Sequence, residues 1–267
     1  MSIIKTEAVR TEHFSMEYFK FGHGSQTLVI LPGLSVQSVM GSADAVAEAY
    51  KLLTEDFTIY LFDRRKELPE QYSVHDMARD TVEAIHALGL ENIAILGASQ
   101  GGVLAMYIAA DEPELVKKLV LASTTAIVTE EQTGPFAKWI ELAKAGDRQG
   151  LYLSFGEAIY PENIFEQFKG VLAEAAETVT DAELERFVIL AEAMRGRNMT
   201  AELEKITCPA LVIGSYDDKV LGGDSSRIIS EHLNVPGSEL YMYDGFGHAA
   251  YDTAPDFKER MLKFLKG

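Results

Sequence analysis

The sequence predicts an α/β protein with a mostly parallel sheet covered by helices on both faces. Short, almost entirely apolar segments of strand length recur along the chain, such as Ile93 to Leu96 and Leu119 to Ala122. Longer segments with apolar residues at helical spacing lie between them, so strand and helix alternate. Strands that are apolar on both faces are typical of a parallel sheet buried between two helical layers.

The first thirty residues predict an antiparallel entry to this sheet. Phe14, Met16 and Tyr18 occupy alternate positions, and the turn signal 22–25 separates them from the apolar run 28–31. The regular alternation then predicts these elements in order: helix 40–50, strand 57–62, helix 74–88 stopped by Gly89, strand 93–96, helix 102–110 and strand 119–122.

The late part of the chain again alternates between strand and helix. It predicts strand 210–213, helix 226–233, strand 239–243 and a final helix that carries Phe257, Met261, Phe264 and Leu265, with Pro255 in its first turn. Between 126 and 200 the pattern predicts helices only, at 136–143, 164–176 and 182–194. We therefore expect a core made of residues 1–125 and 201–267, with 126–200 inserted as a helical cap.

Composition excludes several classes of protein. The 267 residues are 47% hydrophobic and 24% charged, which is typical of a globular chain. The net charge of −17 disfavours nucleic acid and anionic membrane surfaces as partners. No run reaches the roughly 18 apolar residues of a membrane span. The single cysteine, Cys208, and the absence of a signal-peptide segment in 1–10 predict a cytoplasmic location.

The sharpest motif is a G-x-S-x-G sequence, Gly97-Ala98-Ser99-Gln100-Gly101, between an apolar strand and a helix. A chain that reverses from strand to helix within a few residues holds its serine in a strained, accessible turn, and small neighbours let the two backbones approach. The sequence therefore predicts that Ser99 is a nucleophile. The alternative is a glycine-rich turn that only connects two elements.

A serine nucleophile needs a base, and His248 is the best of the six histidines. It follows the last predicted strand, in a loop with glycines that would carry it over the sheet edge. A carboxylate that orients the imidazole should come from another loop at that edge. Asp217 and Asp218 follow the strand 210–213 and qualify by position, whereas Asp244 is a less suitable substitute.

These motifs resemble the α/β-hydrolase fold superfamily over nearly the whole chain. The order Ser99, aspartate, His248 is the family's order of nucleophile, acid and base. The resemblance implies an eight-stranded sheet and a cap after the sixth strand. Gly214-Ser215-Tyr216-Asp217 is similar to the family's G-x-x-D motif, which favours Asp217 over Asp218 as the acid.

The resemblance also implies an oxyanion hole made of two backbone N–H groups, those of Leu34 and Gln100. Leu34 lies in the segment 31–34, where the family usually has a histidine and this chain has Pro32. The segment 63–65 also resembles the family, and we expect it to form structural ion pairs. Aromatic residues of the cap, including Phe136, Trp139 and Phe155, are expected mainly to pack the cap onto the core.

The sequence contains no zinc, P-loop or dinucleotide motif, so no metal or cofactor is expected. The predicted function is a serine hydrolase that cleaves a small carboxylic ester or related acyl compound through an acyl-enzyme. The alternatives on the same triad are a C–C bond hydrolase, a thioesterase and an aminopeptidase, the last with Glu157, Glu162 or Glu166 holding an amine. A ligand-binding protein that kept the scaffold is a further alternative.

Overall fold

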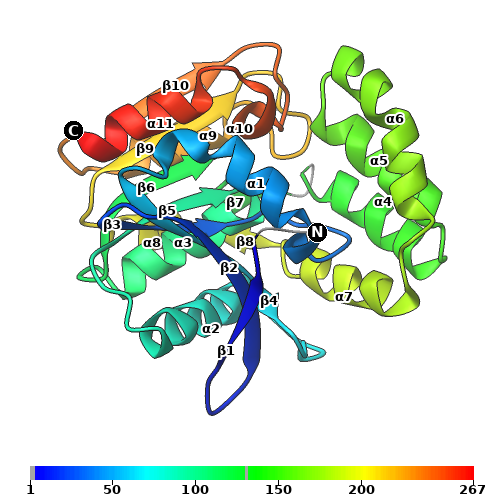
Figure 1. Ribbon diagram of the computed structural model, residues 1–267. Helices are drawn as coiled ribbons and strands as arrows, with labels where there is room; N and C mark the ends of the chain where they lie inside the picture. Colours follow the sequence, from blue (N-terminus) through cyan, green and yellow to red (C-terminus); the bar gives the residue numbers. More distant parts are fainter. Residues whose placement is uncertain (1–3, 130–131) are drawn as a thin grey trace.

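A computed structural model describes residues 4–129 and 132–267 as an eight-stranded sheet flanked by helices (Figure 1). The strand order is β1-β2-β4-β3-β5-β6-β9-β10. Strand β2 pairs antiparallel with β1 and β4, and every other pairing in the sheet is parallel. The antiparallel entry and the mostly parallel sheet predicted from the sequence are both confirmed.

The strands of the main sheet are β1 (Thr6–Arg10), β2 (Ser15–Gly22), β3 (Gln26–Leu31), β4 (Phe57–Arg65), β5 (Ile93–Ala98), β6 (Val116–Ala122), β9 (Ala210–Ser215) and β10 (Glu239–Tyr243). The helices outside the cap are η1 (Val39–Ser42), α1 (Ala43–Ala49), η2 (Lys51–Leu53), α2 (Val74–Ala87), α3 (Gln100–Asp111), α8 (Thr200–Leu203), α9 (Ser225–His232), α10 (Ala250–Thr253) and α11 (Phe257–Lys266).

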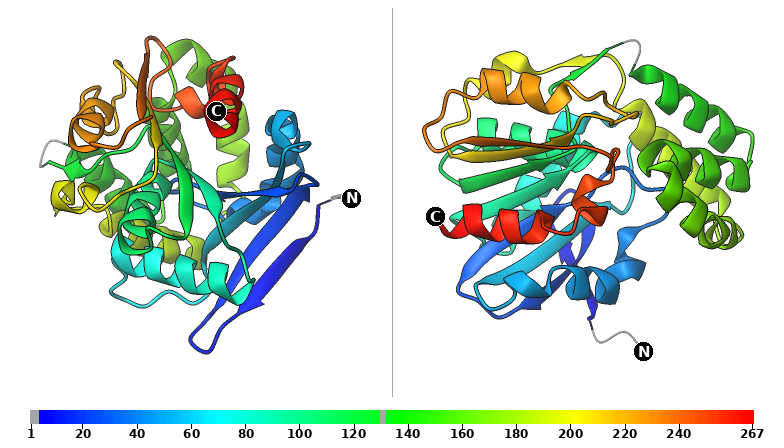
Figure 2. Two further views of the ribbon diagram at one scale, coloured as in Figure 1. Left: turned by 90° about the vertical axis from the view of Figure 1, so that its left-hand side faces the viewer. Right: turned by 90° about the horizontal axis from the view of Figure 1, so that it is seen from above.

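Two apolar layers sandwich the sheet, one on each face. Helices α2, α3 and α9 cover one face, and α1 and α11 cover the other (Figure 2). Strand β5 lies near the middle of the sheet, and all six of its residues are buried. Strand β1 is an edge strand and is mostly exposed, so its sequence does not need the apolar run that marks the central strands.

Four helices form the cap that the sequence predicts between the sixth and seventh strands of the sheet (Figure 1). They are α4 (Thr133–Lys144), α5 (Arg148–Ile159), α6 (Glu162–Ala176) and α7 (Asp181–Glu192). The short strands β7 (Ile127–Val128) and β8 (Arg197–Asn198) pair antiparallel where the chain enters and leaves this region.

The cap differs from the prediction in two respects. The sequence did not predict helix α5, because its apolar residues are spread around the helix and do not form one face. Strands β7 and β8 are too short to leave a periodic pattern. Helix α7 begins where expected, at a capping box in which Thr180 and Glu183 satisfy each other's backbone N–H groups.

Two predicted elements in the core also need correction. The helix expected over 40–50 is divided into η1 and α1, with η2 after it. Pro255 lies two residues before α11 and not in its first turn. The described helices include none that is both long and apolar enough to cross a membrane.

Candidate active site

The carboxyl ends of the parallel strands bring the predicted site residues to one edge of the sheet, beneath the cap. Leu34 follows β3, Ser99 follows β5, Asp217 and Asp218 follow β9, and His248 follows β10. Ligands of open α/β sheets bind at this edge, because the loops of neighbouring parallel strands meet there. The chain therefore gathers residues that are more than two hundred positions apart in sequence.

Ser99 occupies the sharp turn between β5 and α3. Its backbone has φ 51° and ψ −120°, a conformation that L-residues rarely adopt. The turn is held by hydrogen bonds from the Ser99 N–H to the Ala122 carbonyl, 2.9 Å, and from the Thr124 hydroxyl to the Ser99 carbonyl, 2.7 Å. This strained strand-to-helix turn has the geometry expected of a nucleophile elbow.

Glycines make the turn possible because neighbouring backbone atoms lie where a Cβ atom would otherwise be. A Cβ atom on Gly97 would lie 2.5 Å from the Gly101 carbonyl oxygen, and one on Gly101 would lie 2.0 Å from the Leu31 carbonyl oxygen. A Cβ on Gly33 would lie 3.1 Å from the Ser99 Cβ, so the loop after β3 passes directly beside the serine. The glycine requirement is thus steric at Gly97 and Gly101.

His248 lies between the serine and an aspartate. Its Nε2 is 2.9 Å from the Ser99 Oγ, and its Nδ1 is 2.9 Å from the Asp218 Oδ2. The imidazole is 2% exposed, and Ser99 and Asp218 are each 8% exposed. With Nδ1 donating to the carboxylate, Nε2 is free to accept the serine proton, which is the arrangement of a Ser-His-Asp triad.

The carboxylate beside His248 belongs to Asp218, so the preference for Asp217 is wrong on this geometry. The second oxygen of Asp218 accepts hydrogen bonds from the N–H groups of Val220, 2.8 Å, and Leu221, 3.0 Å. Burial opposes ionisation of Asp218, but the charge and hydrogen bond of His248 and these two N–H groups hold its pKa below the usual value. The carboxylate is therefore ionised and fixed in place.

Asp217 instead holds the loop that carries the histidine. Its carboxylate accepts hydrogen bonds from the N–H groups of Gly245 and Gly247, both 3.0 Å, and from the Ser215 hydroxyl, 2.5 Å. Its partial burial favours the neutral acid, but these three donors lower its pKa below the usual value. Asp217 thus stabilises the position of His248 through the backbone on its N-terminal side.

The two predicted oxyanion donors adjoin Ser99. Gln100 is the first residue of α3, where helix geometry leaves its N–H without an intrahelical acceptor. Leu34 follows Gly33, the residue whose backbone passes beside the serine. Their use as a pair stays a prediction of the sequence.

Comparisons with known proteins agree with this architecture. The family model described as the alpha/beta hydrolase fold matches residues 26–151. A protein named putative carbamate hydrolase RutD, from Agrobacterium fabrum, is 28% identical over 244 residues, covering 88% of this chain and 93% of that protein. The serine hydrolase BPHL of Mus musculus is 25% identical over 261 residues, covering 94% and 83%.

The similarity to a solved structure extends over nearly the whole chain. The α/β hydrolase enzyme MGS-M2, from a Medee basin deep-sea metagenome library, superposes with a TM-score of 0.86 at 23% identity, covering 98% of each chain. The chain has the α/β-hydrolase fold, and these likenesses support the α/β-hydrolase superfamily. The expected fold class, with its helical cap, is confirmed.

In this α/β-hydrolase-fold protein the cap closes over the serine. The cavity at Ser99 has a volume of about 20 Å³, and its walls include Phe136, Trp139, Phe155 and Ile159 from the cap. That volume is on the order of one water molecule. These aromatic residues were expected to serve mainly as packing between cap and core, and the structure places them at the serine as well.

A larger cleft of about 760 Å³ adjoins this cavity, between the cap helices α5 and α6 and the loop after β3. The cavity and the cleft share Leu34, Phe155, Ile159 and Tyr251 as lining residues. The cleft carries hydroxyl and amide groups from Ser35, Gln37, Ser38, Tyr152 and Tyr160, and among the described residues Glu183 is the one charged residue of its lining. The site is thus an apolar chamber at the serine beside a polar cleft.

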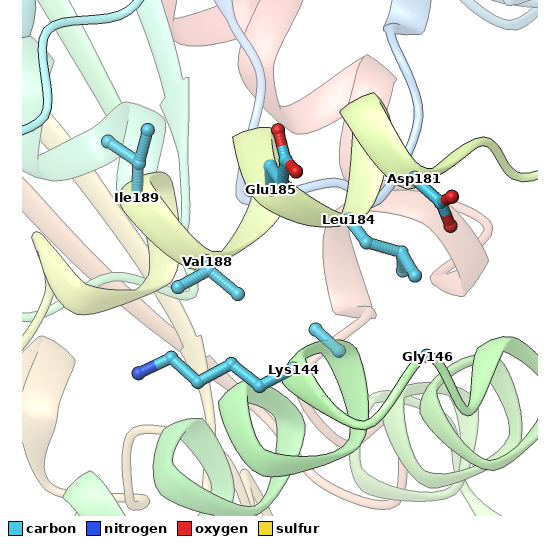
Figure 3. Close-up of a pocket in the computed structure, with 8 residues that line it drawn as sticks. Lys144, Gly146, Asp181, Leu184, Glu185, Val188 and Ile189 are labelled. Atoms are coloured by element: carbon cyan, nitrogen blue, oxygen red, sulfur yellow. The ribbon is translucent and has the colours of Figure 1, made fainter.

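Other features of the cap lie away from the serine. A pocket of about 480 Å³ lies between α4 and α7, where Leu184 and Val188 point toward α4 (Figure 3). Glu157, Glu162 and Glu166 are exposed and line neither the serine cavity nor the cleft. Within residues 4–129 and 132–267, no group of three or more His, Cys, Asp and Glu side chains could hold a metal ion.

Proposed function

We propose that the protein is a cofactor-free serine hydrolase that cleaves small, uncharged carboxylic esters or related acyl compounds through Ser99, His248 and Asp218. The observation that carries this proposal is the continuous chain of hydrogen bonds from Ser99 Oγ through the imidazole to Asp218, with 2.9 Å at each step. An activated serine beside two backbone donors is suited to acyl transfer.

In the proposed reaction, Ser99 Oγ attacks the carbonyl carbon while His248 Nε2 takes the hydroxyl proton. The N–H groups of Leu34 and Gln100 stabilise the negative oxygen of the tetrahedral intermediate, and one such donor is typically worth about 3 kcal/mol of the barrier. His248 then gives its proton to the leaving group, which departs as the alcohol. Water, deprotonated by His248, releases the acid from the acyl-enzyme, and Asp218 keeps the imidazole oriented throughout.

The lining of the cavity supports an uncharged substrate. The side chains that line the cavity at Ser99 in the described chain include no Lys, Arg, Asp or Glu. A carboxylate or ammonium group beside the scissile bond would therefore lose its hydration without gaining a partner. The exposed positions of Glu157, Glu162 and Glu166 give an aminopeptidase-type amine site no support.

Esters and carbamates present the same carbonyl to a serine. Since one relative carries the name putative carbamate hydrolase, a test panel includes aryl carbamates beside aryl esters and thioesters. A vinylogous diketone in that panel examines the C–C hydrolase alternative, because that reaction also begins at a carbonyl. Fold likeness cannot choose among these substrates.

The test compares the wild type with Ser99→Ala on this panel. We expect ester turnover in the wild type and a loss of at least about 10³-fold in Ser99→Ala, because the nucleophile is removed. Ser123→Ala is the matched control: Ser123 is also buried, follows the neighbouring strand β6 and has a positive φ. Circular dichroism checks the fold of both variants.

Two outcomes would overturn the proposal. Undiminished turnover in folded Ser99→Ala would exclude Ser99 as the nucleophile. Tight binding of an ester or its analogue by the wild type, without burst or steady-state hydrolysis across the panel, would favour the ligand-binding alternative.

A further inference from the structure

A buried arginine joins the two segments that contain the proposed oxyanion donors. Arg64, at the end of β4, is 4% exposed. Its Nη2 donates to the Pro32 carbonyl oxygen, 2.9 Å, and to the Gln100 Oε1, 3.1 Å. Pro32 lies two residues before Leu34, and Gln100 is itself the second donor residue. One guanidinium group therefore sets the spacing between the two segments.

Asp63 links this arginine to the cap. One of its oxygens accepts from the Arg64 N–H and from Arg186 Nη2, each 2.7 Å, and the other accepts from the Ser38 hydroxyl, 2.6 Å. Arg186 belongs to the cap helix α7, and Ser38 lies in the loop after β3. The Asp63 side chain is 8% exposed, so solvent screens the Arg186 pair much less than an ion pair at the surface.

A second contact joins the same cap helix to the elbow. The Gln100 Nε2 donates to the Leu190 carbonyl oxygen in α7, 2.8 Å. The side-chain amide of Gln100 thus connects Arg64 in the core with α7 in the cap. Gln100 is 1% exposed. Helix α7 holds both oxyanion segments, one through Arg186 and Asp63 and the other through Gln100.

The charges of this network suit an anionic intermediate. The Arg186 guanidinium pairs with the Asp63 carboxylate, whereas the Arg64 guanidinium donates to two uncharged acceptors, the Pro32 carbonyl and the Gln100 amide, beside the oxyanion segments. Burial lowers the pKa of Arg64 to about 10, despite the opposing effect of Asp63, so the group stays charged at neutral pH. A negative oxygen that develops at Ser99 is therefore favoured by the network as well as by its direct donors.

We propose that Arg64 and Arg186 are positioning residues that couple docking of cap helix α7 to assembly of the oxyanion hole. This inference rests on the proposed function. The cap closes the cavity at Ser99 to about 20 Å³, so a substrate must displace part of the cap to enter. The network then restores the spacing of the Leu34 and Gln100 donors when α7 is docked, and hydrolysis is efficient only in that state.

Arg186→Met is the decisive variant, because it removes the charge of a residue at the cap boundary while keeping its apolar stem. Arg148→Met is the matched control: Arg148 also pairs with α7, through Asp181, but its hydrogen bonds stay within the cap. Arg64→Met tests the centre of the network, and because it deletes a buried charge it is interpreted only if circular dichroism and urea unfolding show a folded protein.

The kinetic readout separates positioning from packing. We expect kcat of an aryl ester to fall by about 10- to 100-fold in Arg186→Met, with KM within about 3-fold, because the oxyanion donors act in the transition state. The inhibition constant of an aryl trifluoromethyl ketone, which forms an oxyanion on Ser99, should rise by a similar factor. Arg186→Lys should recover part of both effects. Arg148→Met should change neither.

A second readout needs no turnover. Hydrogen–deuterium exchange of the segment 33–38 should be faster in Arg186→Met than in the wild type and Arg148→Met, because Asp63, which holds Ser38, loses its partner in α7. Equal exchange of this segment in Arg186→Met and Arg148→Met would overturn the coupling. Unchanged kcat in folded Arg186→Met would overturn the role of Arg186 in catalysis. If the wild type hydrolyses nothing and forms no ketone adduct, the proposed function fails, and the exchange experiment still decides the coupling.

Discussion

Asp217 and Asp218 are adjacent carboxylates with different partners. Asp218 accepts from the His248 imidazole, whereas Asp217 accepts from the backbone of the loop before that histidine. We expect Asp218→Asn to lower kcat by up to about 10⁴-fold, because an amide favours the wrong tautomer of the imidazole. Asp217→Asn should cost far less activity and instead reduce stability, as measured by urea unfolding. A larger loss of kcat in Asp217→Asn would contradict the assignment.

The same pair predicts how stability depends on pH. Partial burial raises the pKa of Asp217, but the hydrogen bonds from Ser215 and the glycine N–H groups outweigh it, so the pKa in the folded protein lies below that in the unfolded chain. The stabilisation is therefore fully present above the unfolded pKa and is lost as the pH falls through the folded pKa. Asp217→Asn should unfold more easily at neutral pH and lose less stability between about pH 5 and pH 2. Parallel curves for variant and wild type would contradict this.

Ser99 and His248 could be placed from the sequence because each follows a strong strand pattern and has glycine neighbours. The choice between Asp217 and Asp218 could not. It depends on how the chain turns after Ser215, where Asp218 accepts from Val220 and Leu221 N–H groups and so becomes buried against the imidazole. Two like residues in succession give no periodic signal that distinguishes these environments.

At the scale of the element, the turn between β5 and α3 depends on glycines that admit no side chain. Gly101→Ala would place a Cβ 2.0 Å from the Leu31 carbonyl oxygen, and we expect it to destabilise the protein by about 3 kcal/mol or more. Gly170 lies inside helix α6, and nothing is within 4 Å of its Cβ position. Gly170→Ala should stabilise by up to about 1 kcal/mol. Urea unfolding distinguishes the two, and equal effects would contradict the steric argument.

Elements with one apolar face were predictable, and elements without one were not. Helix α2 has its buried residues at helical spacing and its capping box at Ser73, so its limits follow from the sequence. Helix α5 is bounded by Asp147 and Tyr160, but its apolar residues contact α4, α6 and the core from several sides. Its amphipathic signal is therefore weak, although its packing is extensive.

At the scale of the molecule, charge predicts substrate preference. The chain carries a net charge of −17, and the walls of the serine cavity include no cationic side chain among the described residues. We expect kcat/KM for a neutral p-nitrophenyl ester to exceed that of a p-nitrophenyl ester with a carboxylate on its acyl chain by at least about 10-fold. Steady-state kinetics at two salt concentrations measures this. Equal values for the two esters would contradict the neutral-substrate proposal.

The overall topology was predictable because alternating strands and helices leave few ways to build a parallel sheet, and the motifs fix which strand ends meet. The closed cap was not predictable. Phe136 and Trp139 pack against each other, and they also wall the serine cavity, so one sequence pattern serves packing and binding together. The contacts of Arg64 and Arg186 likewise join segments far apart in the chain, which no local pattern reveals.

The most direct test of the account is covalent labelling of the folded wild-type protein with a fluorophosphonate, followed by peptide mapping. We expect a single adduct on Ser99, with labelling strongly reduced in Asp218→Asn and retained in Asp217→Asn, because only Asp218 orients the base. Labelling at another serine, or none in protein with an intact fold, would contradict it.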